Sequence, residues 1–461
     1  MDPAIESQDY QTATHNHRIT LFMNDAPKEN HPKARTKGLI SWSLYDWANQ
    51  SFPTVIQTFI FAAYFTRRIA ENETVGSAQW GNALSIAGLI VALGGPVLGA
   101  VADQRGRRKP WIGSLTVLCV ISMAGMWFVR PEQGSVWLAL FLVAAGTIAS
   151  EYAMIFYNAM LPSLSGSKSM GRWSGIGWSM GYAGGLVCLA IALLAFVEGD
   201  GAWFSLDRDT AQHVRATFLL AAVWYLLFSI PLFMFTPDRK ATGKPLGTAV
   251  RDGLAQLMES ARNVRRFRNI VKFLIARMIY IDALATVFAF GGVYAAGTFD
   301  MSEQDVLIFG ISLNVTAGPG AALFSWIDDR IGSKRTIMVS LLGLILSGTT
   351  ILLVRSQFLF WTFGLILGLF VGPVQASSRT FLGRAAPREL RNQMFGLYAF
   401  SGKATSFVGP FLVGWLTYLS GSQRVGMSAI MVLFLLGGIG MFFVSDPEAI
   451  REIQFQEMPK S

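Results

Sequence analysis

Long apolar runs separated by short polar loops dominate the pattern of this chain. A helix needs about 20 apolar residues to cross a bilayer, and runs of that length recur from residue 40 to residue 445. The pattern predicts twelve transmembrane helices, at 40–65, 80–102, 111–129, 136–160, 173–197, 217–236, 272–297, 304–327, 336–354, 358–382, 394–419 and 426–445. We therefore expect an all-α polytopic membrane protein.

The basic residues indicate how these helices are oriented. With a cytoplasmic N-terminus, 29 of the 38 Lys and Arg residues lie in cytoplasmic segments and seven lie in outside loops. Cytoplasmic loops carry such an excess in membrane proteins, so both termini are expected to be cytoplasmic. The net charge of +9 is thereby dispersed over seven segments, which argues against a nucleic-acid-binding surface.

The longest loop divides the predicted helices into two sets of six. We expect five regions, namely a cytoplasmic tail at 1–38, a first half at 39–236, a linker at 237–271, a second half at 272–445 and a tail at 446–461. The first tail is polar and has no apolar core, so it does not resemble a signal peptide, and we expect it to be disordered.

One basic segment of the linker has the character of a membrane-surface helix. Residues 261–269, ARNVRRFRN, are expected to form a short amphipathic helix on anionic lipid headgroups. A basic cytoplasmic loop without a partner is the simpler alternative.

Composition excludes several other classes of protein. The chain is 52% hydrophobic and 15% charged, whereas a soluble protein carries about 25% charge. Its two cysteines, Cys119 and Cys188, lie in apolar runs and give no disulfide framework or metal motif. The four histidines lie outside the predicted spans, so carboxylates would have to carry any transported proton. No P-loop and no HExxH motif are present, so we expect neither an ATP-driven pump nor an enzyme, and no cofactor or metal.

A short motif recurs after the second predicted span of each half. GAVADQRGRRK occupies 99–109 and SWIDDRIGSKR occupies 325–335, so that Asp103 aligns with Asp329 and Gly106 with Gly332. Both copies fall on the cytoplasmic side. Recurrence at equivalent positions indicates an internal repeat.

These loops resemble the signature loop of the major facilitator superfamily, G-x-x-x-D-R-x-G-R-[RK]. The first copy departs from it at Gln104, and the second at Ser325 and Ser333. A turn between helices needs a glycine at the bend, while the carboxylate can cap a helix N-terminus or pair with an arginine. We therefore expect these loops to lock the two halves in one alternating-access state. The expected gating residues are Gly99, Asp103, Gly106, Arg107, Arg108, Asp329, Arg330 and Gly332.

A narrower resemblance covers nearly the whole chain. SWSLYDWANQSF (41–52), FYNAMLPSL (156–164), ARMIYIDALATVFAFGGVYAAG (276–297) and VQASSRTFLGRAAPRELRNQMFGLYAFSGKATSFVGP (374–410) resemble the vacuolar amino-acid effluxer-like family, which includes an autophagy-related yeast effluxer and many bacterial relatives. The resemblance implies a twelve-span secondary transporter, with amino-acid efflux in the fungal members. It implies a vacuolar membrane for a fungal chain and the cell (inner) membrane for a bacterial one, and it does not name the cargo.

Polar residues inside the predicted spans fall mainly on four helices. In the major facilitator fold the first, fourth, seventh and tenth spans line the central cavity. An ionisable residue within a membrane is by default a functional-site hypothesis. The expected substrate or proton-coupling residues are Asp46, Asn49, Glu151, Tyr157, Asn158, Arg277, Asp282, Gln375, Arg379 and Lys403, of which only Lys403 lies off these four spans. The alternative for these residues is bracing between helices or, for Asp46, capping at the headgroup level.

Two further expectations concern pairing and packing. Asp46 is expected to pair with Arg277, Arg379 or Lys403. Glycines at 177, 181 and 185 recur at four-residue spacing, which predicts that the fifth span approaches another helix closely.

The predicted function is secondary active transport, with the two halves rocking about a midplane site. Protonation of Glu151 or Asp282 would neutralise a buried charge and permit the switch, although oxygen ligands would also suit sodium. Amino acids or small peptides are favoured as cargo, and efflux over uptake. We expect the solute, protons and the bilayer as partners, and a monomer. The alternatives are export of drugs, sugar derivatives or cell-wall fragments, and a receptor or scaffold that keeps the fold without transport.

Overall fold

A computed structural model describes residues 36–197 and 206–447, and all regular structure within these ranges is helical. The predicted tails, 1–38 and 446–461, lie almost wholly outside them. The helices are α2 (Thr36–Asn49), α3 (Phe61–Tyr64), α4 (Glu73–Arg105), α5 (Lys109–Gly125), α6 (Val136–Leu164), α7 (Met170–Ala192), α8 (Gln212–Phe235), α9 (Leu246–Arg262), α10 (Arg268–Phe299), α11 (Glu303–Ile331), α12 (Ser333–Leu353), α13 (Gln357–Ala385), α14 (Arg391–Lys403), α15 (Val408–Ser420) and α16 (Gln423–Phe442). Short π- or 3-10-helical segments lie at Phe52–Phe59, Phe65–Ile69, Met126–Phe128, Gln133–Ser135, Ser167–Ser169, Leu193–Val197, Val264–Phe267 and Arg388–Leu390.

Ten helical stretches within the described residues are long and apolar enough to cross a membrane. They contain α4, α5, α6, α7, α8, α10, α11, α12, α13 and α16. Each overlaps one of the spans predicted from the apolar runs. The protein is therefore a multi-pass membrane protein.

The other two predicted spans are interrupted. Span 40–65 begins as α2 and continues through the π-helical segment Phe52–Phe59, which carries a proline in its first turn. Span 394–419 consists of α14 and α15, separated by residues 404–407. Pro410 lies in the first turn of α15, where a missing amide hydrogen does not break the helix. These two ranges are therefore helical but interrupted, and they are not among the ten long apolar stretches of the described residues.

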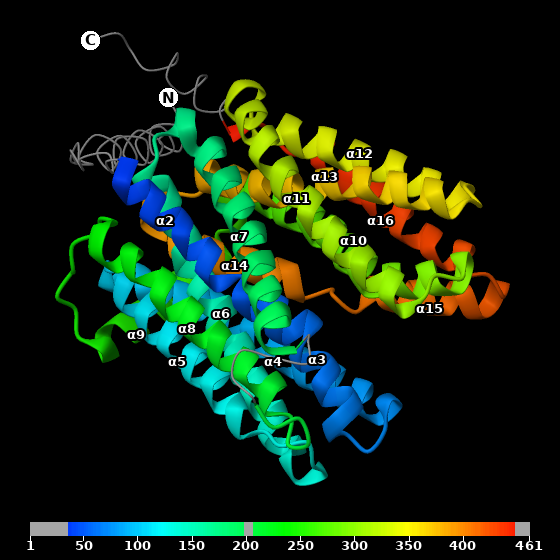
Figure 1. Cartoon of the computed structure of the whole chain (residues 1–461). Coiled ribbons are helices and arrows are strands. Elements are labelled where there is room, and N and C mark those ends of the chain that lie inside the picture. The colour runs from blue at the N-terminus through cyan, green and yellow to red at the C-terminus, as the bar shows by residue number, and fades with distance from the viewer. Residues whose placement is uncertain (1–35, 198–205, 448–461) are drawn as a thin grey trace, which may run out of the picture.

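The helices form two groups that Figure 1 shows in blue to green (α2 to α8) and in yellow to red (α10 to α16). We call them the first and second halves. They converge at the end where α2 begins and α4 and α6 end, named here the linker end, and they diverge toward the opposite end. The most extensive contacts between the halves are those of α4 packed along α14 and of α7 packed along α11.

Small residues allow both helix pairs to approach closely. A Cβ atom on Gly396 of α14 would lie 2.3 Å from the carbonyl oxygen of Gly95 in α4. A Cβ atom on Gly175 of α7 would lie 2.3 Å from the Cβ of Ser325 in α11. The predicted close approach of the fifth span is confirmed, since Cβ atoms on Gly177 and Gly185 would lie 2.5 Å from side-chain oxygens of Asp46 and Thr54 respectively.

The linker contains one amphipathic helix, α9, but not at the predicted place. The structure distributes residues 261–269 over the end of α9, a 3-10 turn and the start of α10, so the prediction of a separate helix there is wrong. Asn263 ends α9. Ala249 and Gly253 are buried against α4, whereas the side chains at every fourth position from 246 to 258 are exposed apolar residues, namely Leu246, Val250, Leu254 and Met258. The four-residue apolar period predicts this helix better than the basic cluster does.

Candidate functional site

Asp46 lies in a hydrogen-bonded cluster that joins the two halves at the linker end. Arg379 of α13 places its Nη1 3.2 Å from Asp46 Oδ2, and both side chains are buried. Tyr157 of α6 donates its hydroxyl to the same carboxylate oxygen over 2.8 Å. Asn158 accepts a hydrogen bond from Arg379 Nη1 over 3.1 Å. Of the three partners predicted for Asp46, the structure selects Arg379.

Aromatic and small residues of the first half hold this cluster in place. Trp42 stacks on Tyr157 with ring centroids 4.5 Å apart, and the Arg379 guanidinium lies 5.0 Å from the Trp42 ring centre. Ser174 of α7 accepts hydrogen bonds from Arg379 through its hydroxyl at 2.9 Å and its carbonyl at 2.5 Å. Gly177 leaves room for the Asp46 carboxylate. A buried charge pair needs such additional hydrogen bonds to offset its lost hydration.

A second ion pair joins the halves between the middle of α6 and the end of α14. Lys403 Nζ of α14 lies 2.7 Å from Glu151 Oε1 of α6. The two side chains are 32% and 35% exposed, so both can be reached by solvent or solute. Lys403 is the last residue of α14, where the negative end of the helix dipole favours a cation.

Arg277 and Asp282 of α10 flank the interruption between α14 and α15. Arg277 donates to the carbonyl of Tyr398 (2.7 Å) and to the hydroxyl of Ser401 (2.6 Å), at the C-terminal end of α14. Asp282 Oδ2 accepts a hydrogen bond from the backbone N–H of Gly409 over 2.9 Å, at the N-terminal end of α15. A cation thus lies at a helix C-terminus and a carboxylate at a helix N-terminus, as the helix dipoles favour.

The two oxygens of the Asp282 carboxylate differ. Oδ2 is bonded to Gly409, whereas Oδ1 is buried and, within the described residues, has no hydrogen-bond partner. Asp282 also forms no ion pair with any residue that the structure describes. Since unsatisfied buried polar atoms are rare, Oδ1 is a place where a proton or a ligand could bind.

The two predicted amide residues make different contacts. Asn49 donates to the hydroxyls of Ser150 (2.9 Å) and Tyr225 (2.6 Å), so it bonds only within the first half. Gln375 of α13 donates to the hydroxyl of Tyr182 in α7 over 3.1 Å and therefore joins the two halves.

The repeated loop carboxylates each cap a helix of the opposite half. Asp103, at the end of α4, accepts the backbone N–H groups of Asn392 (3.2 Å) and Gln393 (2.9 Å) in the first turn of α14. Asp329, at the end of α11, accepts those of Gly171 (2.8 Å) and Arg172 (3.0 Å) in the first turn of α7. The two contacts are equivalent under exchange of the halves.

The glycines of these loops have the expected roles in the backbone. Gly106 and Gly332 have φ angles of +82° and +89°, which favour glycine. A Cβ atom on Gly99 would lie 2.3 Å from the carbonyl oxygen of Asn392. Each loop therefore turns at one glycine, and the first also needs a small residue where α4 meets α14.

The predicted arginines of these loops divide into two kinds. Arg108 is buried and donates from Nε to Asn392 Oδ1 over 2.8 Å, so it reaches the second half. Arg107 and Arg330 are exposed and, among the described residues, their side chains form no hydrogen bond or ion pair. The structure does not bring Arg107 and Arg330 to the contact between the halves.

Sequence analysis missed the residues that complete the second loop. Arg384 of α13 is buried, with its Nη1 2.7 Å from Asp328 and its Nη2 3.2 Å from Asp329. Its Nη2 also donates to the carbonyl of Ser167 in the first half over 3.3 Å. The adjacent carboxylates at 328 and 329 were the available signal, because two neighbouring acids at a helix end need a cation.

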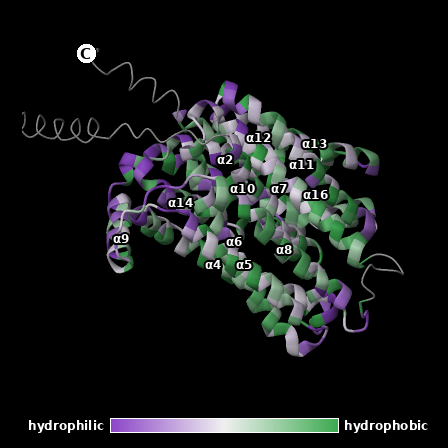
Figure 2. Ribbon diagram, turned by 60° about the vertical axis from the view of Figure 1, so that its left-hand side comes forward, coloured by the Kyte–Doolittle hydropathy of each residue, from purple (hydrophilic) through white to green (hydrophobic). Residues whose placement is uncertain are grey.

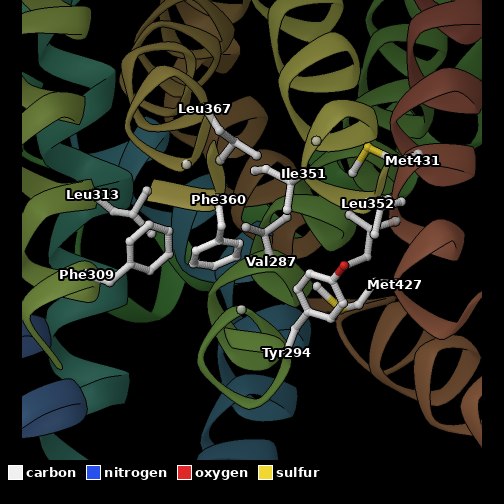
Figure 3. A pocket seen from close by; sticks show the side chains of 14 residues that line it. Val287, Tyr294, Phe309, Leu313, Ile351, Leu352, Phe360, Leu367, Met427 and Met431 are labelled. Atoms are coloured by element: carbon white, nitrogen blue, oxygen red, sulfur yellow. The ribbon is translucent and has the colours of Figure 1, made fainter. Parts of the chain in front are cut away.

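The apolar cavity drawn in Figure 3 is not the site. It has a volume of about 50 Å³ and lies within the second half, between side chains of α10, α11, α12, α13 and α16. None of the predicted site residues lines it. Its lining contains no charged side chain, so it offers no partner for the ammonium and carboxylate groups of an amino acid.

One motif of hydrolases occurs in the chain without its context. Residues 177–181, GWSMG, match GxSxG, in which the serine is a nucleophile at a turn between a strand and a helix. Here they lie in the interior of α7, packed against Asp46. The match therefore does not indicate a catalytic serine.

Relatives of the chain agree with the fold and with the resemblance found in the sequence. The MFS-type transporter YxiO of Bacillus subtilis is 26% identical over 421 residues, which cover 90% of this chain and 96% of that protein. Autophagy-related protein 22 of Cryptococcus neoformans is 22% identical over 290 residues, 59% of this chain. The aligned part is 52% of that fungal protein, about half its length.

Solved structures show the same fold at low sequence identity. The proton:xylose symporter XylE, a major facilitator superfamily protein, superposes with a TM-score of 0.71 at 16% identity, covering 90% of this chain and 98% of that chain. A bacterial homologue of the iron transporter ferroportin in an outward-facing state superposes with a TM-score of 0.63 at 12% identity, over 88% and 98% of the two chains. A profile of the family described as "Vacuole effluxer Atg22 like" matches residues 82–454. The chain therefore belongs to the Atg22-like family of major facilitator superfamily transporters.

Proposed function

We propose that this protein is a twelve-span, proton-coupled secondary transporter that exports amino acids or small peptides by alternating access. The excess of Lys and Arg in the predicted cytoplasmic segments supports a cytoplasmic linker end and cytoplasmic termini. The family to which the chain belongs is described as "Vacuole effluxer Atg22 like", which supports efflux. The arrangement of the charged residues supports the division of labour set out below.

The linker end acts as the cytoplasmic gate in this proposal. Asp46 and Arg379 form a buried pair across the two halves, and the carboxylates of Asp103 and Asp329 cap helices of the opposite half. These contacts hold the cytoplasmic side closed. Opening toward the cytoplasm requires the ion pair and both caps to break together. The change from the closed to the open conformation would then be two-state.

The observation that carries the choice of cargo is the pair formed by Glu151 and Lys403. Its two charges come from different halves, lie 2.7 Å apart and are partly exposed. A zwitterionic amino acid offers an ammonium group for Glu151 and a carboxylate for Lys403. By replacing each partner of the pair, such a solute would separate the two side chains without leaving either charge unpaired, and so would couple binding to movement of the halves.

Asp282 is the proposed proton site. Its carboxylate is buried beside the interruption of α14 and α15, and its Oδ1 atom has no hydrogen-bond partner within the described residues. Interrupted helices in transporters provide backbone groups for ion binding at mid-membrane depth. A proton on Oδ1 would remove the buried charge and weaken the hold of Asp282 on the N-terminus of α15.

The test is uptake and counterflow of a labelled amino-acid panel in proteoliposomes, with and without an imposed pH gradient. We expect the wild type to accumulate one class of amino acid in response to the gradient. We expect Asp282→Asn to lose the gradient response and keep counterflow, because the variant resembles the protonated carboxyl group.

Three outcomes would contradict parts of the proposal. No movement of any amino acid by well-folded protein would exclude this cargo and move the search to drugs, sugar derivatives and cell-wall fragments. Transport that ignores both the gradient and the substitution would exclude proton coupling at Asp282. Gradient-driven transport that persists in Asp282→Asn and is lost in Glu151→Gln would assign the proton to Glu151 instead.

A further inference from the structure

A basic hollow opens at the linker end between the first turn of α5 and the end of α8. It has a volume of about 510 Å³, and its lining includes Arg107, Lys109, Asp238, Arg239 and Lys240, with Phe233 on the apolar wall. Four basic residues and one acidic residue thus line a single hollow, and one of the four, Lys109, already donates from Nζ to the carbonyl of Phe233 over 2.9 Å. Its lining residues belong to the first half and the linker, and Asp46, Arg379, Glu151 and Lys403 are not among them.

The single carboxylate of the hollow is already used by the backbone. Asp238 accepts the N–H groups of Arg108 (3.0 Å), Lys109 (3.0 Å) and Arg239 (2.8 Å). It therefore caps the N-terminus of α5 and does not pair with the cationic side chains of Arg107 or Lys240. Within the described part of the chain, those two side chains form no hydrogen bond or ion pair. The hollow accordingly offers unused cationic donors to an anion.

A phosphate group fits this set of donors. Its several acceptor oxygens can take hydrogen bonds from a guanidinium and an ammonium group at once. A carboxylate has fewer acceptor positions to share among Arg107, Lys240 and the neighbouring Arg239. The apolar wall formed by Phe233 would suit an uncharged portion of the same molecule.

The surroundings of the hollow indicate where such a phosphate comes from. The outward faces of α5 and α8 continue from it as exposed apolar side chains, among them Val117 and Ile121 of α5 and Leu227 and Met234 of α8 (Figure 2). In a membrane protein these faces contact lipid tails. An amphiphile with its phosphate in the hollow could therefore extend its acyl chains along the same two helices.

We propose that the hollow is a binding site for the phosphate headgroup of an anionic phospholipid of the cytoplasmic leaflet. Basic pockets between transmembrane helices on the cytoplasmic side are suited to anionic lipid headgroups. The site is connected to the second half, because Arg239 Nη2 donates to the carbonyl of Arg388 over 2.7 Å. Its Asp238 also holds the backbone of Arg108, whose side chain reaches Asn392. Bound lipid would therefore favour the conformation in which the linker end is closed.

Native mass spectrometry of the full chain tests the site directly. The protein is titrated with phosphatidylglycerol or with phosphatidylcholine, and the wild type is compared with Arg107→Gln/Lys240→Gln. The matched control is Arg265→Gln/Arg266→Gln, which removes two exposed arginines of the same linker. We expect the first double variant to bind phosphatidylglycerol about 25-fold more weakly, since each basic residue near an anionic lipid contributes a factor of about five.

The control arms decide between the alternatives. Equal loss of phosphatidylglycerol binding in both double variants would overturn the site and leave only general attraction to anionic lipid. Equal binding of phosphatidylcholine to the wild type would overturn the requirement for an anionic headgroup. Binding of millimolar inorganic phosphate to the wild type but not to Arg107→Gln/Lys240→Gln, with equal phosphatidylglycerol binding by the two proteins, would overturn the lipid as the source and assign the hollow to a soluble phosphate. Because no transport is measured, these outcomes do not depend on the cargo proposed above.

Discussion

Three carboxylates within the membrane-spanning region have three different surroundings. Asp46 is buried and bonded to Arg379 and Tyr157. Glu151 is partly exposed and paired across the halves with Lys403. Asp282 has one oxygen bonded to a backbone amide and one with no partner among the described residues. We therefore expect these three carboxylates to have three different roles, which substitutions can separate.

Replacing Arg379 by Gln should destabilise the protein strongly. The substitution leaves Asp46 buried without a cation, and breaking a buried pair from one side costs about 3–5 kcal/mol. We expect a marked fall in the thermal unfolding midpoint of purified protein. The double variant Asp46→Asn/Arg379→Gln should recover part of the loss, because no uncompensated charge is left.

The control for this prediction is Arg130→Gln, which changes an exposed arginine and should leave the midpoint nearly unchanged. A midpoint for Arg379→Gln equal to that of the control would show that the pair contributes nothing to the folded state.

Substitutions that remove or exchange the charges of Glu151 and Lys403 should distinguish a role in binding the solute from a role in bracing the two halves. Glu151→Gln is expected to raise the KM of counterflow for a zwitterion, because the ammonium group of the solute loses its partner. Glu151→Lys/Lys403→Glu restores opposite charges with reversed polarity, so counterflow should return in part. If both variants transport with wild-type KM, the pair is a brace and the cargo site lies elsewhere.

At the scale of elements, hydropathy located the helices and missed their interruptions. Apolar runs predicted ten spans that the structure contains as continuous helical stretches. They did not predict the interruption at 404–407, because the contact between Asp282 and Gly409 joins residues 127 positions apart. The reciprocal caps are of the same kind, since Asp103 and Gln393 are 290 positions apart. At both places the sequence showed a carboxylate, but it did not show which distant backbone amide that carboxylate would bind.

The helix pair α4 and α14 should be sensitive to added volume. Gly396→Ala would place a Cβ 2.3 Å from the carbonyl oxygen of Gly95, so the helices must separate. Overpacking costs about 1–3 kcal/mol, and the thermal unfolding midpoint should fall.

Gly414→Ala gives a contrast of opposite sign. Gly414 lies in the interior of α15 with nothing within 4 Å of a built Cβ, so alanine should stabilise the helix by about 0.5–1 kcal/mol. If the thermal unfolding midpoint falls by a similar amount in both variants, the close approach of α4 and α14 does not contribute specifically to stability.

At the scale of the whole molecule, the contacts between the halves are distributed unequally. At the linker end they include one buried ion pair and two sets of backbone caps. At the opposite end the halves share an exposed ion pair between Arg67 and Glu303, with side chains 55% and 87% exposed. Exposed pairs of this kind contribute about 0–1 kcal/mol. The described conformation is therefore held closed mainly at one end.

A disulfide across the linker end should arrest the transport cycle. Gly175 and Ser325 lie in different halves, and their Cβ positions are close enough for cysteines at both places to bond after a small separation of the helices. Counterflow by Gly175→Cys/Ser325→Cys should stop on oxidation and return on reduction. The native Cys119 and Cys188 are buried and need not be removed. Unchanged counterflow by fully cross-linked protein would exclude movement of α7 against α11.

Asp103 at the end of α4 caps α14, and Asp329 at the end of α11 caps α7. This reciprocal capping has a consequence for the ancestry of the chain. Each half supplies one carboxylate and receives one, so the surface it presents is complementary to itself. Such an isologous surface is what a two-fold symmetric dimer of identical subunits requires. A gene for a single six-helix unit could therefore have formed the same closed contact as a homodimer before duplication and fusion. The later differences, such as Ser325 in place of a glycine, became possible once each copy had only one partner to fit.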